Sequence, residues 1–169
     1  MIEQQISATL YSKVEEFATW FLRPGFYTDV GLWFDRTLLT DEMELAGAPY
    51  PTAFPNVAFP PKDHPEYSSK IYLEVRHFRN TNVSSEWGTG RDLMGILQIS
   101  VVDPLQAGEL TALGIASLIV EYFKKNTNLW TEGMERILIY ESPTVLTMVQ
   151  DGNKSIHPVS IPYRVYQTA

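Results

Sequence analysis

The spacing of hydrophobic residues at the start of the chain predicts an amphipathic helix over residues 2–22. Apolar side chains recur there at steps of three or four, which places them on one face of an α-helix. They are Ile2, Ile6, Leu10, Val14, Phe17 and Phe21. Pro24 and Gly25 should end this helix, because the residue before a proline resists the α conformation.

A second helical pattern covers residues 106–125, and it is the clearest in the chain. Its apolar residues share one face: Ala112, Ile115, Ile119, Tyr122 and Phe123. Small residues on the same stretch would let its backbone approach a sheet closely: Gly108, Gly114, Ala116 and Ser117. Lys124 and Lys125 suit the negative end of the helix dipole, so we expect the helix to end near them.

Strict alternation of apolar and polar residues predicts strands at residues 70–79 and 93–102. In the first strand Ile71, Leu73 and Val75 lie on one side, and more polar residues lie between them. A polar, glycine-bearing connection, residues 80–92, joins the two strands. They should therefore form a hairpin, with a loop much longer than the two to five residues that are typical.

Three further strands are predicted at residues 136–141, 144–150 and 155–166, with a turn at residues 151–153. Pro158 and Pro162 cannot donate to a hydrogen-bonded ladder, so we expect the last strand to be bulged or at a sheet edge. The short connection after the second helix leaves open whether the strand at 136–141 runs parallel or antiparallel to its neighbour.

Residues 26–65 form the part of the chain with the least regular pattern. Prolines at positions 49, 51, 55, 60, 61 and 65 exclude a helix or a central strand over its second half. We expect an extended arm pinned by Tyr50, Phe54, Val57 and Phe59. The whole chain, residues 1–169, is then one α+β domain: an antiparallel or mixed β-sheet of about five strands packed against two helices, with an extended proline-rich arm.

Composition and charge narrow the classes of function. With 44% hydrophobic residues the chain can build a core, and its longest nearly apolar stretch, residues 112–120, is too short to cross a bilayer. The absence of cysteine excludes disulfides, thiol catalysis and iron–sulfur clusters, and is compatible with a reducing cytoplasm. The net charge of −7 is unlike that of a protein that grips nucleic acid.

Most of the negative charge lies between Asp29 and Glu66, where seven acids and two bases contribute −5 of the −7. Asp41, Glu42 and Glu44 form the densest group in this segment, and we interpret them as an acidic surface. Such a surface suits either a partner or a lumen that repels phosphates, and an outward, solubilising face is the alternative.

No catalytic, cofactor or metal site is predicted. The three histidines, His64, His77 and His157, lack a zinc-ligand spacing. His77 continues an apolar strand face and should be a packed or rim residue, whereas His64 and His157 adjoin prolines and should lie in loops or at strand edges. A GxSxG elbow is absent, and Gly88-Thr89-Gly90 lacks the rest of a phosphate-binding pattern. The chain is therefore not expected to be an enzyme.

Four stretches of the chain carry a resemblance to a known family. They are FPNVAFPPKDHPEYSSKIYLEV (residues 54–75), GILQISVVDPLQAG (95–108), the small-residue helix after it, and HPVSIPYRVY (157–166). Through them, residues 52–166 resemble the tail terminator, or tail completion, proteins of tailed bacteriophages, of the lambda-like minor tail type. The longer segment at residues 24–51 departs from the smaller members.

The resemblance implies a structural protein of the virion, at the head-proximal end of the tail, assembled in the host cytoplasm. Such proteins form a ring, typically a hexamer, that caps the tail tube, stops its polymerisation and presents a surface to the head completion or connector protein. DNA passes through the ring without specific binding. Another head–tail junction ring or tail assembly protein of similar fold is one alternative. A small enzyme or ligand-binding domain is another, and it would need a pocket with convergent polar groups.

In a ring of this kind, the loop at residues 80–92 is the candidate contact with a neighbouring subunit or the tail tube. Trp87 lies in the middle of this loop among polar residues, and an exposed tryptophan often marks a binding surface. Packing of the loop on itself is the alternative. The predicted interface residues are Asn82, Ser84, Glu86, Trp87, Thr89 and Arg91.

Overall fold

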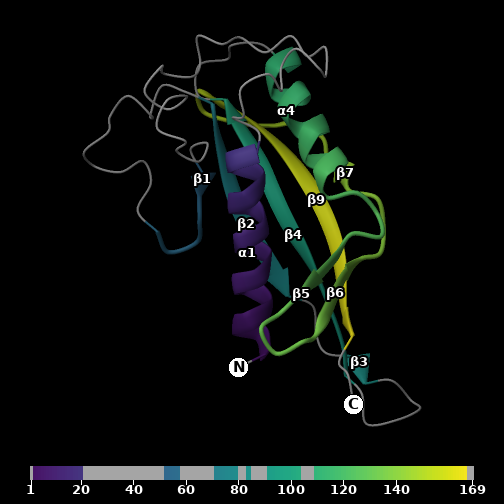
Figure 1. Ribbon diagram of the computed structural model, residues 1–169. Coiled ribbons are helices and arrows are strands. Elements are labelled where there is room, and N and C mark those ends of the chain that lie inside the picture. Colours follow the sequence, from purple (N-terminus) through teal and green to yellow (C-terminus); the bar gives the residue numbers. More distant parts are fainter. Residues whose placement is uncertain are drawn as a thin grey trace.

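The computed structural model describes residues 2–20, 52–57, 71–79, 83–84, 91–103 and 109–166 (Figure 1). The two helices are α1 (Ile2–Trp20) and α4 (Glu109–Tyr122). The strands are β1 (Thr52–Ala53), β2 (Tyr72–Arg79), β3 (Val83–Ser84), β4 (Arg91–Asp103), β5 (Asn128–Trp130), β6 (Arg136–Ile139), β7 (Thr144–Val145), β8 (Val149–Asp151) and β9 (Lys154–Tyr166). The α+β class is confirmed, and these residues form more strands than the expected five. The rest of the predicted arm lies outside the described residues.

The strands form one mixed sheet in the order β1-β2-β4-β9-β6-β5, and β3, β7 and β8 add short pairings to β4 and β9. The predicted hairpin is confirmed, with β2 antiparallel to β4 from Tyr72 opposite Val102 to Arg79 opposite Gly95. The β6 strand also runs antiparallel to its neighbours, so the parallel alternative for residues 136–141 is wrong. The one parallel pair among the described strands joins β1 to β2.

Two predicted segments differ from the structure in detail. Strand β4 begins at Arg91, and β3 pairs with it, so the connection over residues 80–92 contains a short ladder instead of being all loop. The expected strand at residues 144–150 is two short strands, β7 and β8, and the sequence pattern missed β5. The predicted turn is present, because Asp151 pairs with Lys154 around Gly152, whose positive φ of 58° suits glycine.

The last strand, β9, is central, so its predicted position at the sheet edge is wrong. It pairs without a break with β4, from Leu93 opposite Val165 to Asp103 opposite Ser155. Its other side is shared by three short strands in turn: β8 opposite residues 154–156, β7 opposite residues 159–160 and β6 opposite residues 163–166.

The two prolines of β9 fall in the gaps between those three short strands. The carbonyl of Pro158 accepts a hydrogen bond from the Leu146 amide, 2.8 Å away, so its backbone faces away from β4. Pro162 lies four residues further along, and residues an even number apart face the same side of a strand. Neither proline therefore removes a bond from the β4 ladder, and this is why a proline-bearing strand can be central.

Both helices pack on one face of the sheet and make the core there. The α1 stripe buries Ile6, Leu10, Val14 and Phe17, as its spacing predicts. Phe17 is 6.2 Å from Phe123, ring centroid to ring centroid, which links the first helix to the end of α4. Figure 1 shows α1 running along β2 and β4, and α4 beside β7 and β9. Neither helix is long and apolar enough to cross a membrane.

The described part of the arm extends the sheet. Thr52 and Ala53 of β1 lie opposite Leu73 and Glu74 of β2 in parallel. The ring of Phe54 then packs edge-on against Tyr11 of α1, with 5.6 Å between the ring centroids. An extended edge strand is what the surrounding prolines allow.

Gly95 of β4 is predicted to be a position that accepts no side chain. A Cβ there would meet the hydroxyl of Tyr163 and lie 2.7 Å from the Phe78 carbonyl oxygen. Gly95→Ala should therefore destabilise the fold by about 1–3 kcal/mol, the usual cost of overpacking. Urea unfolding measures it, with Ser160→Ala on the other face of the same sheet as control. Equal unfolding midpoints for the two variants would contradict the packing described.

Candidate functional site

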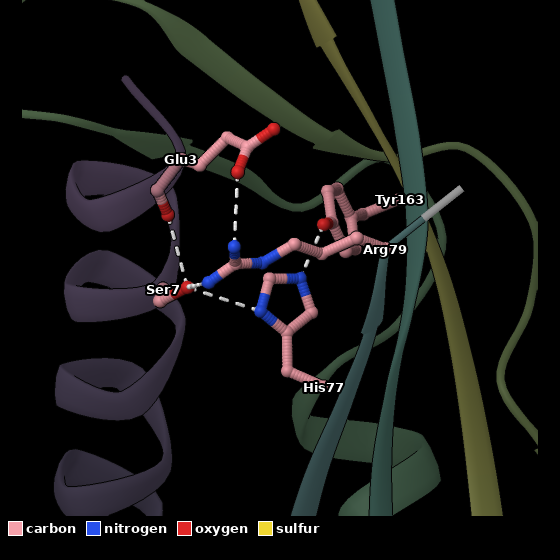
Figure 2. A network of polar contacts seen from close by, with 5 residues as sticks. All are labelled: Glu3, Ser7, His77, Arg79 and Tyr163. Carbon is pink, nitrogen blue, oxygen red and sulfur yellow. Dashed lines mark hydrogen bonds and ion pairs between the residues drawn. The ribbon is translucent and has the colours of Figure 1, made fainter. Parts of the chain in front are cut away.

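The most organised group of polar side chains joins α1 to the sheet (Figure 2). Glu3 and Ser7 come from the first two turns of α1, His77 and Arg79 from the end of β2, and Tyr163 from β9. The Arg79 guanidinium forms an ion pair with Glu3, with 2.9 Å from Nη1 to Oε2. Its other terminal nitrogen donates to the Ser7 hydroxyl at 3.2 Å.

His77 lies at the centre of this group. Its Nδ1 is 3.1 Å from the Ser7 hydroxyl, and its Nε2 is hydrogen-bonded to the Tyr163 hydroxyl. The Ser7 hydroxyl donates to the Glu3 carbonyl at 2.9 Å, so its single proton is already engaged. The His77 Nδ1–H must then donate to Ser7, and Tyr163 must donate to Nε2. One neutral tautomer satisfies every group.

Burial favours this neutral arrangement. It lowers the pKa of His77 below its usual range, and the Arg79 guanidinium lowers it further, while Glu3 acts in the opposite direction. Burial also raises the pKa of Tyr163 to about 12, so this phenol keeps its proton and can donate. His77 and Tyr163 are therefore both held in their neutral forms at neutral pH.

The geometry of this network favours a structural role over catalysis. Both lone pairs of the Ser7 oxygen accept hydrogen bonds, from Arg79 and His77, so no base is free to activate it as a nucleophile. The cavity beside the network measures about 20 Å³, which is room for one water and too little for a substrate. We conclude that the network of Glu3, Ser7, His77, Arg79 and Tyr163 fixes the N-terminal half of α1 to β2 and β9, and we call this network the clamp.

The sequence predicted His77 as a packed or rim residue, and the structure confirms this. His157 was predicted at a loop or strand edge, and this is wrong: it is 2% exposed, within the central strand β9 and opposite Val101. Sequence reasoning missed the clamp partners Glu3, Ser7, Arg79 and Tyr163. The one signal for them was a histidine on an apolar strand face, two residues before an arginine.

Most of the predicted interface residues lie outside the described part of the chain. Ser84 and Arg91 are described as backbone, and they lie opposite each other where β3 pairs with β4. Asn82, Glu86, Trp87 and Thr89, and the acidic residues Asp41, Glu42 and Glu44, lie outside the described residues. Among the residues that the structure describes, no three histidine or acidic side chains lie close enough together to hold a metal ion.

A groove of about 740 Å³ lies between α1 and β5. Its lining combines amide and hydroxyl side chains with the apolar residues Leu129 and Trp130, and it contains one ion pair, between Lys13 and Glu16 at 2.6 Å. Glu16 also accepts a hydrogen bond from the Tyr122 hydroxyl at 3.4 Å, so both charged groups of this ion pair are engaged within the subunit.

The clamp makes stability depend on pH through His77. The unfolded histidine titrates near 6.5 and the folded one lower, so below that pH the unfolded chain binds a proton that the folded chain does not. Stability should be complete above about pH 6.5 and fall as the pH decreases toward the folded pKa. His77→Gln should therefore make the free energy of unfolding depend less steeply on pH. The contribution of one proton to that slope is at most about 1.4 kcal/mol per pH unit.

Urea midpoints of the native protein and His77→Gln, measured from about pH 7 to about pH 5, check this prediction. Carboxylate titration affects both proteins alike, so the difference between the two curves reports His77. If the two proteins lose stability in parallel over this range, His77 takes up a proton equally readily in the folded and the unfolded state, which would contradict the prediction.

Comparisons with known proteins bear on what this fold does. The protein-family model described as phage tail terminator protein matches residues 36–163. One solved structure, whose title states no function, has a TM-score of 0.66 at 18% sequence identity, covering 99% of this chain and 97% of its own. Another, titled as the virion of a native gene transfer agent particle, has a TM-score of 0.49 at 17% identity, covering 83% and 91%. No curated protein matched.

The first solved structure shares the fold, and the family match carries the assignment. The family match extends over well more than half of the 169 residues. It contains α4 and the strands from β1 to Tyr163 of β9. The chain therefore belongs to the phage tail terminator family and is a structural protein of the phage tail.

Proposed function

We propose that this protein caps the head-proximal end of the tail tube as a ring, ends tube polymerisation and provides the surface for head–tail joining. The observation that carries the proposal is the family match over residues 36–163. A homohexamer is the assembly that the resemblance implies. The tail tube protein lies on one side of it, the head completion or connector protein on the other, and DNA passes through without specific binding.

The shape of the sheet supports a ring. A closed ring of identical subunits uses heterologous contacts, in which two unlike surfaces of one chain meet. This sheet has unlike edges, because β1 borders it on one side and β5 on the other. It also has unlike faces, because both helices pack on one of them.

Two parts of the chain are proposed as contact surfaces. Ser84 and Arg91 lie opposite each other at the end of the ladder that makes β3 and β4 a hairpin. We infer that Asn82, Ser84, Glu86, Trp87, Thr89 and Arg91 contact a neighbouring subunit or the tube. Asp41, Glu42 and Glu44 supply negative charge, directed at the lumen or at a partner.

Tube polymerisation tests the proposed function directly. Purified protein added to polymerising tube protein should stop growth and leave tubes of limited length with a cap at one end, visible by negative-stain electron microscopy. Native mass spectrometry of the capped ends should give six copies. Tubes that grow to the same length with and without the protein would refute tube capping. Unaltered tube growth together with loss of head joining would indicate the alternative junction ring.

Trp87→Ala is predicted to weaken capping by about tenfold or more, because a buried aromatic contributes roughly 1.5–3 kcal/mol. Leu110→Ala is the matched control, since Leu110 is 86% exposed at the start of α4, away from the hairpin. The concentration needed to cap half of the tubes measures the effect. Normal capping by Trp87→Ala would mean that the loop at residues 80–92 packs only on itself.

In the same assay, the variant Asp41→Asn/Glu42→Gln/Glu44→Gln tests the acidic surface. Normal capping and head joining by this variant would favour a solubilising role for these three residues.

A further inference from the structure

One end of the sheet face opposite the helices exposes a row of apolar side chains. Phe78 of β2 lies opposite Ile96 of β4, and Ile96 lies opposite Pro162 of β9. Phe78 is 47% exposed and Ile96 is 39% exposed. Further along β4 on the same face, Ser100 and Val102 are buried, so along this strand the apolar exposure is confined to the end near its start. Large apolar residues grouped in this way mark an interaction surface.

Two arginines continue this exposed surface in the next rows of the sheet. Arg164 of β9 lies opposite Met94, donates to its sulfur at 3.4 Å and lies over the Tyr140 ring, 5.5 Å from the ring centroid. Arg136 of β6 lies opposite Tyr166, 4.6 Å above its ring. On its other side Arg136 lies opposite Trp130, which is 58% exposed.

Neither of these arginines forms an ion pair with a carboxylate in the described part of the chain. Both are oriented by aromatic rings instead, which holds the guanidinium in place without neutralising it. We call this surface the arginine face, made by Phe78, Ile96, Trp130, Arg136, Arg164 and Tyr166. Aromatic residues and arginine are the types enriched at the centres of protein interfaces.

The helix side of the same molecule has the opposite charge. Helix α1 has three acids against one base, and α4 has two acids and no base. Glu15 and Glu16 are both exposed near the C-terminal end of α1, and Glu16 forms an ion pair with Lys13 one turn earlier. This end of the helix already carries the negative pole of the helix dipole, so the carboxylates add to an existing negative field.

We propose that the arginine face binds the acidic side of α1 of a second copy of this chain. The contact is heterologous, because the face and the helix are different surfaces, and such contacts close into rings. The arginines gain the carboxylates they lack within the described part of their own subunit. Phe78 on β2 and Trp130 on β5 add exposed apolar area on either side of them. The proposal rests on the proposed ring and names the surfaces that form it.

Charge reversal on the two surfaces tests this contact. Arg136→Glu/Arg164→Glu should reduce subunit association by about tenfold or more, measured by native mass spectrometry and cross-linking, both in solution and on tail tubes. Lys124→Glu/Lys125→Glu, the same charge change after α4, should associate normally. Adding Glu15→Arg/Glu16→Arg to the first variant should restore association, because the charges are then exchanged across the interface. Trp130→Ala, which changes no charge, should also weaken association.

Each other result overturns the proposal. Normal association of the arginine variant, with an unchanged melting temperature, would exclude the arginine face. Loss of association without rescue by the α1 reversal would exclude α1 as the partner. Normal subunit association with loss of tube binding would assign the face to the tube. Tube capping by the wild-type protein decides the proposed function separately, since a ring that fails to cap tubes would leave this contact intact.

Discussion

The pairing of β4 with β9 is the constraint on which the rest of the structure depends. These two long strands pair in register over eleven residues, from Leu93 opposite Val165 to Asp103 opposite Ser155. Every other strand except β1 and β5 pairs directly with one of them. The odd-numbered residues from Leu93 to Asp103 and from His157 to Val165 turn toward the helices and are buried, so the ladder fixes the face on which the core forms. A slip of one residue would exchange this face for the exposed one.

The elements with a local period could be predicted from the sequence, whereas their arrangement could not. The stripe of α1 and the alternation in β2, β4 and β9 depend on neighbouring residues, so the sequence pattern locates them correctly. The position of β9 depends on which segments pair with its second side, and these come from three separate strands. A proline excludes a central position only when an unbroken partner strand needs its missing amide proton. The second side of β9 has gaps at Pro158 and Pro162, so these prolines do not place the strand at an edge.

The clamp escaped prediction for the same reason. Glu3 and Ser7 are about seventy positions away from His77, and Tyr163 is a further 86 positions along, so no spacing rule connects them. The packing around Tyr163 is tight, because its ring and hydroxyl fill the space that a side chain at Gly95 would need. A histidine in an apolar alternation indicated that partners existed, but their identity required the fold. The interface residues between Asn82 and Thr89 and the acidic residues near Asp41 stay predictions.

The proposed capping of the tail tube requires binding with strict orientation, because a cap that tilts leaves part of the tube end open. A rigid subunit meets this requirement, and here rigidity comes from two sources. The core joins α1 to α4 through Phe17 and Phe123, and the clamp fixes the other end of α1 to β2 and β9 through one defined pattern of proton donors. Together they hold both ends of the helix, so the orientation of its acidic outer surface relative to the sheet is set by the interior of the subunit.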